Sequence, residues 1–303
     1  MSFFKSLALG SALSLAAIAT ASAADLPSRK AAPVAPAAGP ACYEKEGVPT
    51  DVFGFTTGSD VNDRGALSGS ATYGGAYGTR FGRLHSHTGT LQLSYGAFDC
   101  AEIGPYVFGN RTDAKILGFS SDASAYGGGI EMKYKLLGRD VHGVGLTLVL
   151  DPSAARNDIS GFGNPNFTAY NTGLRMFIDK TLVPGKLYGA INISHDMTWT
   201  GPSGYFKSST FTVGAALSYQ VVDGFYLGAE ARHQRRYADL GFGNEAGYAT
   251  FLGPNFYWQA TKALGITAAY NIQVAGKAKG VSGDLDLVNF SQHNLKVKAA
   301  YSF

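Results

Sequence analysis

Polar and apolar residues alternate along most of the chain after residue 66, which is the pattern of β-strands with two different faces. In residues 211–221 (FTVGAALSYQV), for example, Phe, Val, Leu and Tyr share one face with alanine, while Thr, Ser and Gln share the other with small residues. The same alternation predicts twelve strands, near residues 66–80, 87–98, 101–110, 125–137, 143–151, 167–179, 186–197, 209–221, 225–237, 247–260, 264–275 and 293–303.

The connections between these strands alternate in length. Five are short (FDCAE, LGRDVHG, TLVPGK, VVDG and TKAL), whereas others are long and polar, such as DPSAARNDISGFGNPN and GKAKGVSGDLDLVNFSQ. An even number of strands with short turns at one end and long loops at the other is typical of bacterial outer-membrane barrels. The predicted fold class is therefore all-β, a transmembrane antiparallel up-and-down β-barrel of about twelve strands.

A soluble β-sandwich is the alternative architecture, because its strands alternate as well. It would use strands of about five or six residues and carry more surface charge. Pro105 and Pro254 fall inside two of the predicted strands, and a closed barrel has no edge strand to tolerate them. We therefore expect a bulge or a different strand boundary at these two prolines.

Composition supports the membrane barrel. Charged residues are 16% of the chain, aromatic residues are 13%, and there are 40 glycines, whereas charged residues are about 25% of an ordinary soluble protein. No apolar run after Ala23 approaches the roughly 18 residues of a membrane helix. The net charge of +3 is too small to indicate a nucleic-acid partner, and no basic motif supports one.

The N-terminal region predicts export. Residues 1–23 combine Lys5, an apolar stretch and the small residues Ala21-Ser22-Ala23, which is the layout of a secretory signal peptide cleaved after Ala23. Residues 24–50 are rich in proline and alanine and predict a flexible periplasmic tail. Residues 51–303 keep one character throughout, which predicts a single barrel domain.

The two cysteines, Cys42 in the tail and Cys100 in the turn FDCAE, would reach an oxidising compartment, where a disulfide between them is the natural interpretation. If both termini are periplasmic, that turn is periplasmic too, and the bond would tether the tail to the barrel rim. Two free thiols are the alternative. No CxxC motif is present to indicate zinc or redox chemistry.

The two ends of the chain resemble known outer-membrane proteins. The last residues, NLKVKAAYSF, resemble the C-terminal signal by which the barrel-assembly machinery recognises its substrates, with Tyr301 and Phe303 as the aromatic positions. The segment AADLPSRKAAPVAP is similar to the start of mature alphaproteobacterial outer-membrane proteins, including porins. Twelve strands resemble the monomeric small-solute channels and transporter-type barrels of the outer membrane, and FGFTTGSDVNDRG resembles the entry segment of such barrels.

If the apolar faces contact lipid, the opposite faces line the lumen. The residues assigned to the lumen in this way are Glu131, Lys133, Lys135, Asn171, Arg175, Asp179, Glu230, Arg232, Gln234, Arg236, Lys296 and Lys298. Seven of them are cations and three are acids, so the predicted lumen has a positive excess of four. In one interpretation these charges line an open, anion-preferring pore. In the other they pair across a narrow lumen, for example Glu131 with Lys133 or Glu230 with Arg175, and close it.

Enzymatic and metal chemistry find little support. A lipid hydrolase needs a serine within reach of a histidine base, but alternation places His195 on the lipid face and Ser194 and Asp196 on the other. The segment DVNDRG (60–65) resembles a calcium loop only superficially, because Arg64 occupies a ligand position. We expect no cofactor or metal.

The sequence therefore predicts a Gram-negative outer-membrane protein, exported by a Sec-type pathway, that passes small hydrophilic solutes with a mild anion preference. Its expected partners are outer-membrane lipid, lipopolysaccharide, the barrel-assembly machinery and the solutes, and a monomer is favoured. A non-conducting structural or surface-interaction barrel is the alternative class, and a lipid hydrolase is a weaker one.

Overall fold

The structure is a computed structural model that describes residues 42, 44, 51–80, 82–116, 119–159, 166–201 and 206–303. The predicted signal peptide and all of the predicted tail except Cys42 and Glu44 lie outside the described residues.

Twelve β-strands form the wall of the described part of the chain. They are β1 (Leu67–Thr79), β2 (Gly82–Phe98), β3 (Ala101–Ile116), β4 (Phe119–Leu137), β5 (Gly145–Asp158), β6 (Phe167–Val183), β7 (Leu187–Gly201), β8 (Lys207–Val222), β9 (Phe225–Tyr237), β10 (Glu245–Gln259), β11 (Leu264–Ala278) and β12 (His293–Ser302).

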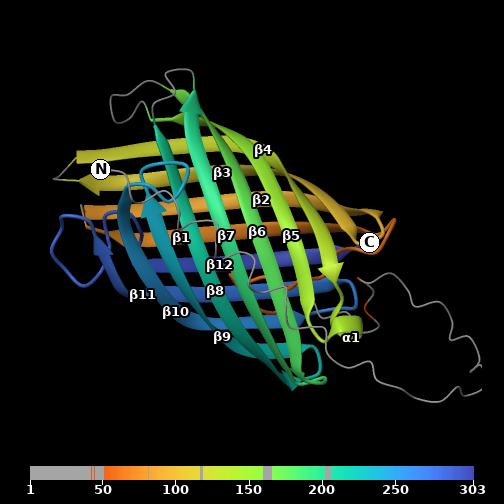
Figure 1. Ribbon diagram of the computed structural model, residues 1–303. Helices are drawn as coiled ribbons and strands as arrows, with labels where there is room; N and C mark the ends of the chain where they lie inside the picture. Colours follow the sequence, from red (N-terminus) through yellow and green to blue (C-terminus); the bar gives the residue numbers. More distant parts are fainter. Residues whose placement is uncertain are drawn as a thin grey trace, which may run out of the picture. The chain divides into compact units, whose positions relative to one another are not determined.

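Each strand pairs antiparallel with its neighbours in the sequence, and β1 also pairs with β12, from Ser68 opposite Ser302 to Tyr77 opposite His293. The sheet is thus a closed barrel of inclined strands (Figure 1). Closure leaves no strand edge, so each strand finds backbone partners on both sides. The predicted twelve-stranded antiparallel barrel is confirmed.

The two ends of the barrel differ. We call "turn end" the end that holds the short β2–β3, β4–β5, β6–β7, β8–β9 and β10–β11 connections together with Leu67 and Phe303, and "loop end" the opposite one. At the turn end a short helix, α1 (Arg139–His142), joins β4 to β5 and ends at Gly143, whose φ is 70°. Among the described residues, no helix has the length and apolar character needed to cross a bilayer.

Several strands continue further at the loop end than the alternation predicted. β2 begins at Gly82, β3 runs to Ile116, β4 begins at Phe119 and β5 runs to Asp158, so the β1–β2 and β3–β4 connections have only two residues each. The loops expected at 81–86 and 111–124 are therefore mostly strand. Beyond the hydrocarbon layer a strand needs no apolar face, so the hydrophobic pattern ends before the hydrogen-bonded ladder does.

The expectation about the two prolines was wrong. Pro105 pairs with Ile130 in β4 and Pro254 pairs with Ala229 in β9, each within an ordinary strand. The ladder on the other side has a gap at each proline, between Gln92–Tyr106 and Tyr95–Ile103 and between Leu252–Ile272 and Asn255–Ala269, with the register unchanged across it. Each proline thus forfeits pairing with one neighbour only. β10 does carry an irregularity, but it lies between Thr250 and Phe251.

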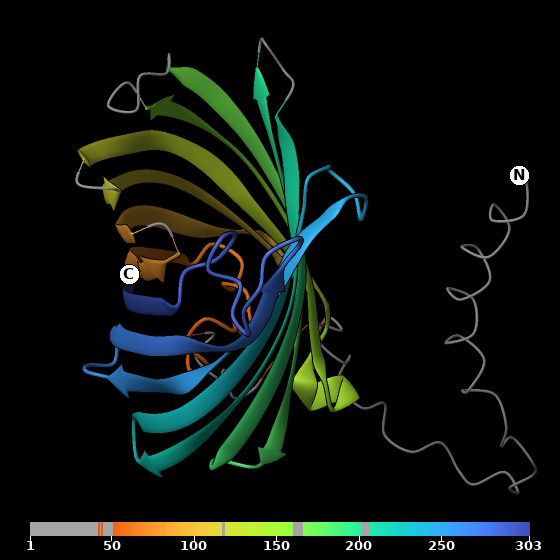
Figure 2. The same ribbon diagram turned by 90° about the vertical axis from the view of Figure 1, so that its left-hand side faces the viewer.

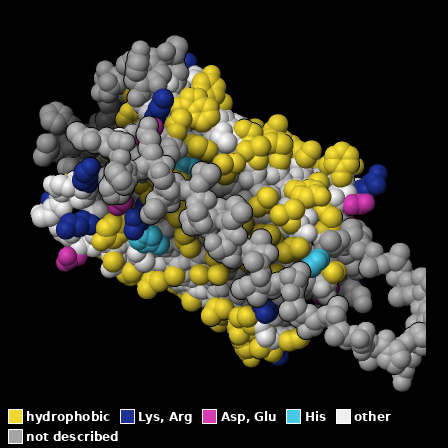
Figure 3. All heavy atoms as spheres, in the orientation of Figure 1, with side chains coloured by type: hydrophobic (Ala, Val, Ile, Leu, Met, Phe, Trp, Pro, Cys, Tyr) yellow, Lys and Arg dark blue, Asp and Glu magenta, His cyan; other side chains and the backbone are white. Residues whose placement is uncertain are grey.

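The outward face of the wall is apolar, as the alternation predicted. Leu91, Leu148, Leu217 and Leu252 are 45–61% exposed, while the alternate residues of the same strands face inward. Figure 3 shows such hydrophobic side chains over one face of the barrel. In a soluble sandwich these side chains would be buried between two sheets, so the alternative architecture is excluded.

Residues 51–63 lie inside the barrel, and we call them the inner segment (Figure 2, orange trace within the ring of strands). Val52 and Phe53 are 0% and 1% exposed, and they pack against Tyr188, Tyr226 and Tyr257 on the inner wall. The sequence assigned these residues to the barrel domain but did not predict that they occupy its lumen.

Candidate functional site

The inner segment follows the wall of the lumen rather than crossing it once. Its polar contacts run from Thr267 of β11 and Lys298 of β12 at Asp51, through β8, β9 and β6, to Glu102 of β3 at Asn62. Glycine permits two of the closest approaches. Gly54 has φ of 83°, and a Cβ there would lie 2.7 Å from the Cβ of Ala269; a Cβ on Gly96 would lie 1.9 Å from the carbonyl oxygen of Asp63.

Glu230 of β9 holds the middle of the inner segment. Its carboxylate accepts hydrogen bonds from the backbone N–H of Phe55 at 3.0 Å and of Thr56 at 3.0 Å, and from the Thr56 hydroxyl at 3.3 Å. The Asn271 amide donates to the same carboxylate at 3.1 Å. Both oxygens of this buried carboxylate therefore have hydrogen-bond donors, as buried polar groups require.

A second attachment forms at Asp179 of β6 and at α1. The Asp179 carboxylate accepts from the backbone N–H and the hydroxyl of Ser59 at 2.7 and 2.8 Å, and it pairs with Arg139 at 2.7 Å. Asp60, the next residue of the segment, pairs with Arg139 and Lys135 at 2.5 Å each. Glu44 also pairs with Lys135, at 2.7 Å. Asp179 and Lys135, which were predicted to line a pore, therefore hold the inner segment and the chain before it.

The two lysines of β12 contact the start of the inner segment. Lys298 pairs with Asp51 at 2.8 Å, and Lys296 donates to the carbonyl oxygen of Gly54 at 2.6 Å. Burial tends to raise the pKa of Asp51, but attraction to Lys298 and Lys296 outweighs it and leaves that pKa below its ordinary value. The ion pair is therefore complete near neutral pH and weakens only as the pH falls through this lowered pKa.

Arg232 of β9 packs against the inner segment without a carboxylate partner among the described residues. Its guanidinium lies 3.9 Å from the centre of the Phe55 ring and 5.3 Å from that of Phe251, and its Nε donates to Asn271 at 2.8 Å. Asn271 thereby links Arg232 to Glu230. Arg236, two residues further along β9, donates to the hydroxyls of Thr210 and Ser208 at 2.9 Å each.

On the other side of the lumen, Arg175 of β6 lies among acids. It contacts Asp151 at 2.8 Å, Asp196 at 3.0 Å and Glu131 at 3.6 Å. Lys133 bridges Glu131 and Glu102 at 3.0 Å each. The pairing proposed between Glu131 and Lys133 is present, whereas Glu230 is held by the inner segment instead of by Arg175.

All the ionisable residues assigned to the lumen do face the interior, but the predicted positive excess is wrong. Six carboxylates and one cation, Arg139, were missed, and together they offset it. The carboxylates are Glu102, Asp151 and Asp196 on the wall, Asp51 and Asp60 on the inner segment, and Glu44 before it. The three on the wall sit on inward positions of β3, β5 and β7, so the same alternation could have found them. The two on the inner segment lie outside the strand pattern.

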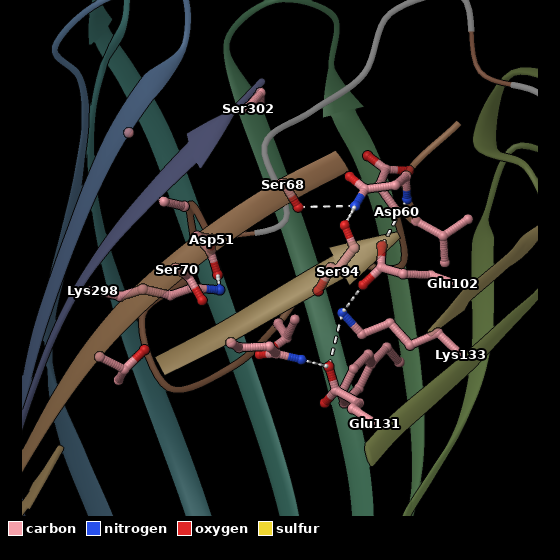
Figure 4. A pocket seen from close by; sticks show the side chains of 18 of the residues that line it. Asp51, Asp60, Ser68, Ser70, Ser94, Glu102, Glu131, Lys133, Lys298 and Ser302 are labelled. Atoms are coloured by element: carbon pink, nitrogen blue, oxygen red, sulfur yellow. Dashed lines mark hydrogen bonds and ion pairs between the residues drawn. The ribbon is translucent and has the colours of Figure 1, made fainter. Parts of the chain in front are cut away.

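A cavity of about 1210 Å³ remains beside the inner segment. It begins at the turn end, near Cys100 and Phe303, and it reaches Arg175, Asp196 and Gln234. Arg175 lies four positions closer to the loop end than Asp179 on β6, and Gln234 lies four positions closer than Glu230 on β9. Four positions correspond to about 13 Å along a strand. One wall of the cavity consists of hydroxyl and amide side chains of β1 and β2, including Ser68, Ser70 and Ser94 (Figure 4).

The β11–β12 connection fills part of the lumen near the loop end. Asp286 of the β11–β12 connection is 0% exposed, and its backbone exchanges hydrogen bonds with the Gln273 amide at 2.6 and 3.2 Å. Phe290 of the same connection packs against Phe251, 6.3 Å between ring centres. This connection therefore narrows the lumen on the β10–β11 side.

Cys42 and Cys100 form a disulfide, as the sequence predicted. The bond fixes the chain that precedes the inner segment to the β2–β3 turn, close to the point where Gly65 donates to the carbonyl oxygen of Gly96 at 2.7 Å. The inner segment is thus anchored at the turn end on both sides.

We expect the double variant Cys42→Ser/Cys100→Ser to lower the free energy of unfolding. The cysteines are 58 residues apart, and a cross-link of that span contributes at most about 4 kcal/mol by restricting the unfolded chain. Denaturant unfolding in detergent micelles measures the change. Reduced wild-type protein should unfold at the same midpoint as the variant, and equal midpoints for oxidised protein and variant would contradict the expectation.

His195 and the C-terminal aromatic residues lie where alternation placed them. The His195 ring faces outward, and its Nε2 lies 2.8 Å from the carbonyl oxygen of Leu240, whereas Ser194 and Asp196 hydrogen-bond to each other inside. Tyr301 and Phe303 are 46% and 75% exposed at the turn end, where Phe303 N–H donates to the carbonyl oxygen of Leu67 at 3.0 Å. No cluster of three metal-ligating side chains occurs within the described ranges.

Comparisons with known proteins agree with the fold. One family model, described as a family of unknown function (DUF6662), matches residues 49–303. No curated protein matches the sequence. Among solved structures, the β domain of the Bordetella autotransporter BrkA has a TM-score of 0.56 at 12% identity, over 79% of this chain and 100% of that one.

Two further structures are similar. An outer membrane channel from Pseudomonas putida F1 has a TM-score of 0.52 at 13% identity, over 85% of this chain and 100% of that one. The translocator domain of the autotransporter NalP from Neisseria meningitidis has a TM-score of 0.51 at 14% identity, over 81% of this chain and 91% of that one. These likenesses show the fold of an outer-membrane barrel.

Proposed function

We propose that this chain, which belongs to the family of unknown function DUF6662, is an outer-membrane channel through which small polar solutes diffuse passively. The observation that carries the proposal is the cavity of about 1210 Å³, which continues from the turn end past the level of the inner segment. A closed wall with an apolar exterior and a polar, partly empty interior is the arrangement by which a β-barrel conducts solutes across lipid.

The inner segment would act as the constriction of this channel. It is held by carboxylates and lysines of the wall. On the β1–β2 side Asn62 donates to the Ser68 hydroxyl at 2.9 Å and to the carbonyl oxygen of Ser94 at 3.0 Å, and the cavity lies beside these contacts. Cations and carboxylates nearly balance along the lumen. We therefore expect weak overall ion selectivity, and not the anion preference expected from the sequence. The outer membrane is the proposed location, and Tyr301 and Phe303 would present the C-terminal strand to the barrel-assembly machinery.

The test is planar-bilayer recording of the refolded mature protein in potassium chloride. We expect discrete conductance steps and a reversal potential close to zero in a salt gradient, since neither sign of charge dominates. A preparation that is folded, as shown by resistance to protease, yet passes no current would reject the channel. The alternative, a structural or surface-interaction barrel whose lumen is closed by the inner segment, would then stand.

A further inference from the structure

The charges around the cavity are divided between its two sides. On β3 to β7, four carboxylates surround two cations, and we call this group the anionic cluster: Glu102, Glu131, Asp151, Asp196, Lys133 and Arg175. With ordinary ionisation the anionic cluster carries a net charge of two negative units. Glu131 and Asp196 both line the cavity.

The opposite side is positive. Arg232, Lys296 and Lys298 line the cavity from β9 and β12, and we call them the cationic cluster. Their acidic neighbours are Asp51, which pairs with Lys298, and Glu230, whose hydrogen bonds go to the inner segment and to Asn271. Lys296 and Arg232 have no carboxylate within ion-pair distance among the described residues. Glu230 still attracts both at longer range, and the three cations against Asp51 and Glu230 leave this side with a net charge of one positive unit with ordinary ionisation.

A neutral polar wall joins the two clusters. β1 and β2 lie between β12 and β3 in the barrel, and they present Ser68, Ser70, Thr72, Thr90, Gln92 and Ser94 to the cavity. Figure 4 shows this succession, with Lys298 on one side, Ser68, Ser70 and Ser94 in the middle, and Glu102, Glu131 and Lys133 on the other. Ser68 already accepts a hydrogen bond from Asn62 at 2.9 Å, and Gln92 donates one to Glu131 at 3.1 Å. The other hydroxyl groups of this wall can bind the uncharged middle of a solute whose ends reach the two clusters.

We infer that the cavity binds and passes amphoteric solutes about the size of a di- or tripeptide. The ammonium end of the solute faces the anionic cluster, the carboxylate end faces Lys296 and Arg232, and the amide groups between them hydrogen-bond to the β1–β2 wall. Opposite charges on facing walls attract a molecule that carries both charges in the matching orientation, while a singly charged ion is repelled by one wall. An extended tripeptide separates its terminal charges by about 10 Å. This inference rests on the proposed channel.

Four forms of one peptide test it. Proteoliposomes containing the mature protein are loaded with dilute, equal concentrations of triglycine, N-acetyl-triglycine, triglycine amide and N-acetyl-triglycine amide, and release is followed by mass spectrometry at pH 7. The four differ in terminal charge and little in size. We expect triglycine to leave about threefold faster than the doubly blocked peptide, and both singly charged forms to be slower than triglycine.

Two variants assign the preference to the clusters. Lys296→Gln and Glu131→Gln should each bring the release of triglycine close to that of the doubly blocked peptide, whose own rate reports an intact pore. Glu245→Gln, at the exposed loop end and with a side chain 41% exposed, is the matched control and should keep the preference. Equal release of all four peptides through a protein that conducts salt would overturn the inference and leave the channel standing. Absence of both conductance and release would reject the channel itself.

Discussion

Replacement of residues 51–61 by a short Gly-Ser linker is expected to raise the single-channel conductance about threefold or more, because a twelve-stranded wall without its inner segment encloses a much wider lumen. The wall should still form, since its strands pair with one another and not with the segment. A short linker suffices because Cys42 is bound to Cys100, and Gly65 and Ala66 pair with nearby Gly96. Planar-bilayer recording measures the change.

The control for this deletion is the double variant Cys42→Ser/Cys100→Ser, which loses the tether but keeps the attachments of the segment at Glu230 and Asp179. Its conductance should remain that of the wild type. If the linker variant folds into a protease-resistant barrel and conducts like the wild type, then the inner segment is not the constriction, and the passage would have to be limited elsewhere, for example by the β11–β12 connection.

Glu230→Gln is expected to release the middle of the inner segment without unfolding the barrel. The carboxylate accepts two backbone N–H groups, one hydroxyl and one amide, and a neutral amide of the same shape can accept with only one oxygen. Leaving a buried donor unsatisfied costs about 2 kcal/mol. Local opening should therefore become roughly 30-fold more frequent.

Hydrogen exchange of the Phe55 and Thr56 amides measures this opening, and single-channel current noise should increase in parallel if the segment moves within the pore. Glu245→Gln again serves as the control, because its carboxylate pairs with Arg235 at the exposed loop end, away from the inner segment. Unchanged exchange at Phe55 and Thr56 in Glu230→Gln would show that packing of Val52 and Phe53, and not the carboxylate, holds the segment.

Much of the wall was predictable, and the errors have a common physical origin. Leu217 and Ser218 illustrate the success, because one is 52% exposed and the other is fully buried, as a period of two requires. The errors at Pro105 and Pro254 arose because the rule for edge strands ignores that one missing N–H disrupts only one of the two ladders. The strands were predicted too short at the loop end because the hydrophobic pattern follows the thickness of the hydrocarbon layer, whereas the backbone hydrogen bonds between strands continue beyond it.

The lumen was less predictable than the wall. Alternation placed Glu230, Asp179, Lys135 and Lys298 inward, yet it could not show that their partners are residues 51–60, which are 75 to 247 positions away in the sequence. The net charge was misjudged partly for the same reason, since the inner segment supplies Asp51 and Asp60. The other part was an incomplete count, because the inward carboxylates of β3, β5 and β7 were left out although alternation could have found them.

What the sequence determined by itself is the wall: the number of strands, which side chains meet lipid, and closure into a barrel. Each of these follows from a local repeat of two residues and from the need of every strand for partners in an apolar surrounding. What only the tertiary structure decided is the interior. The course of the inner segment, the pairing of its charges and the division of the remaining charges between two sides of the cavity depend on contacts between residues far apart in the chain, and no local repeat encodes them.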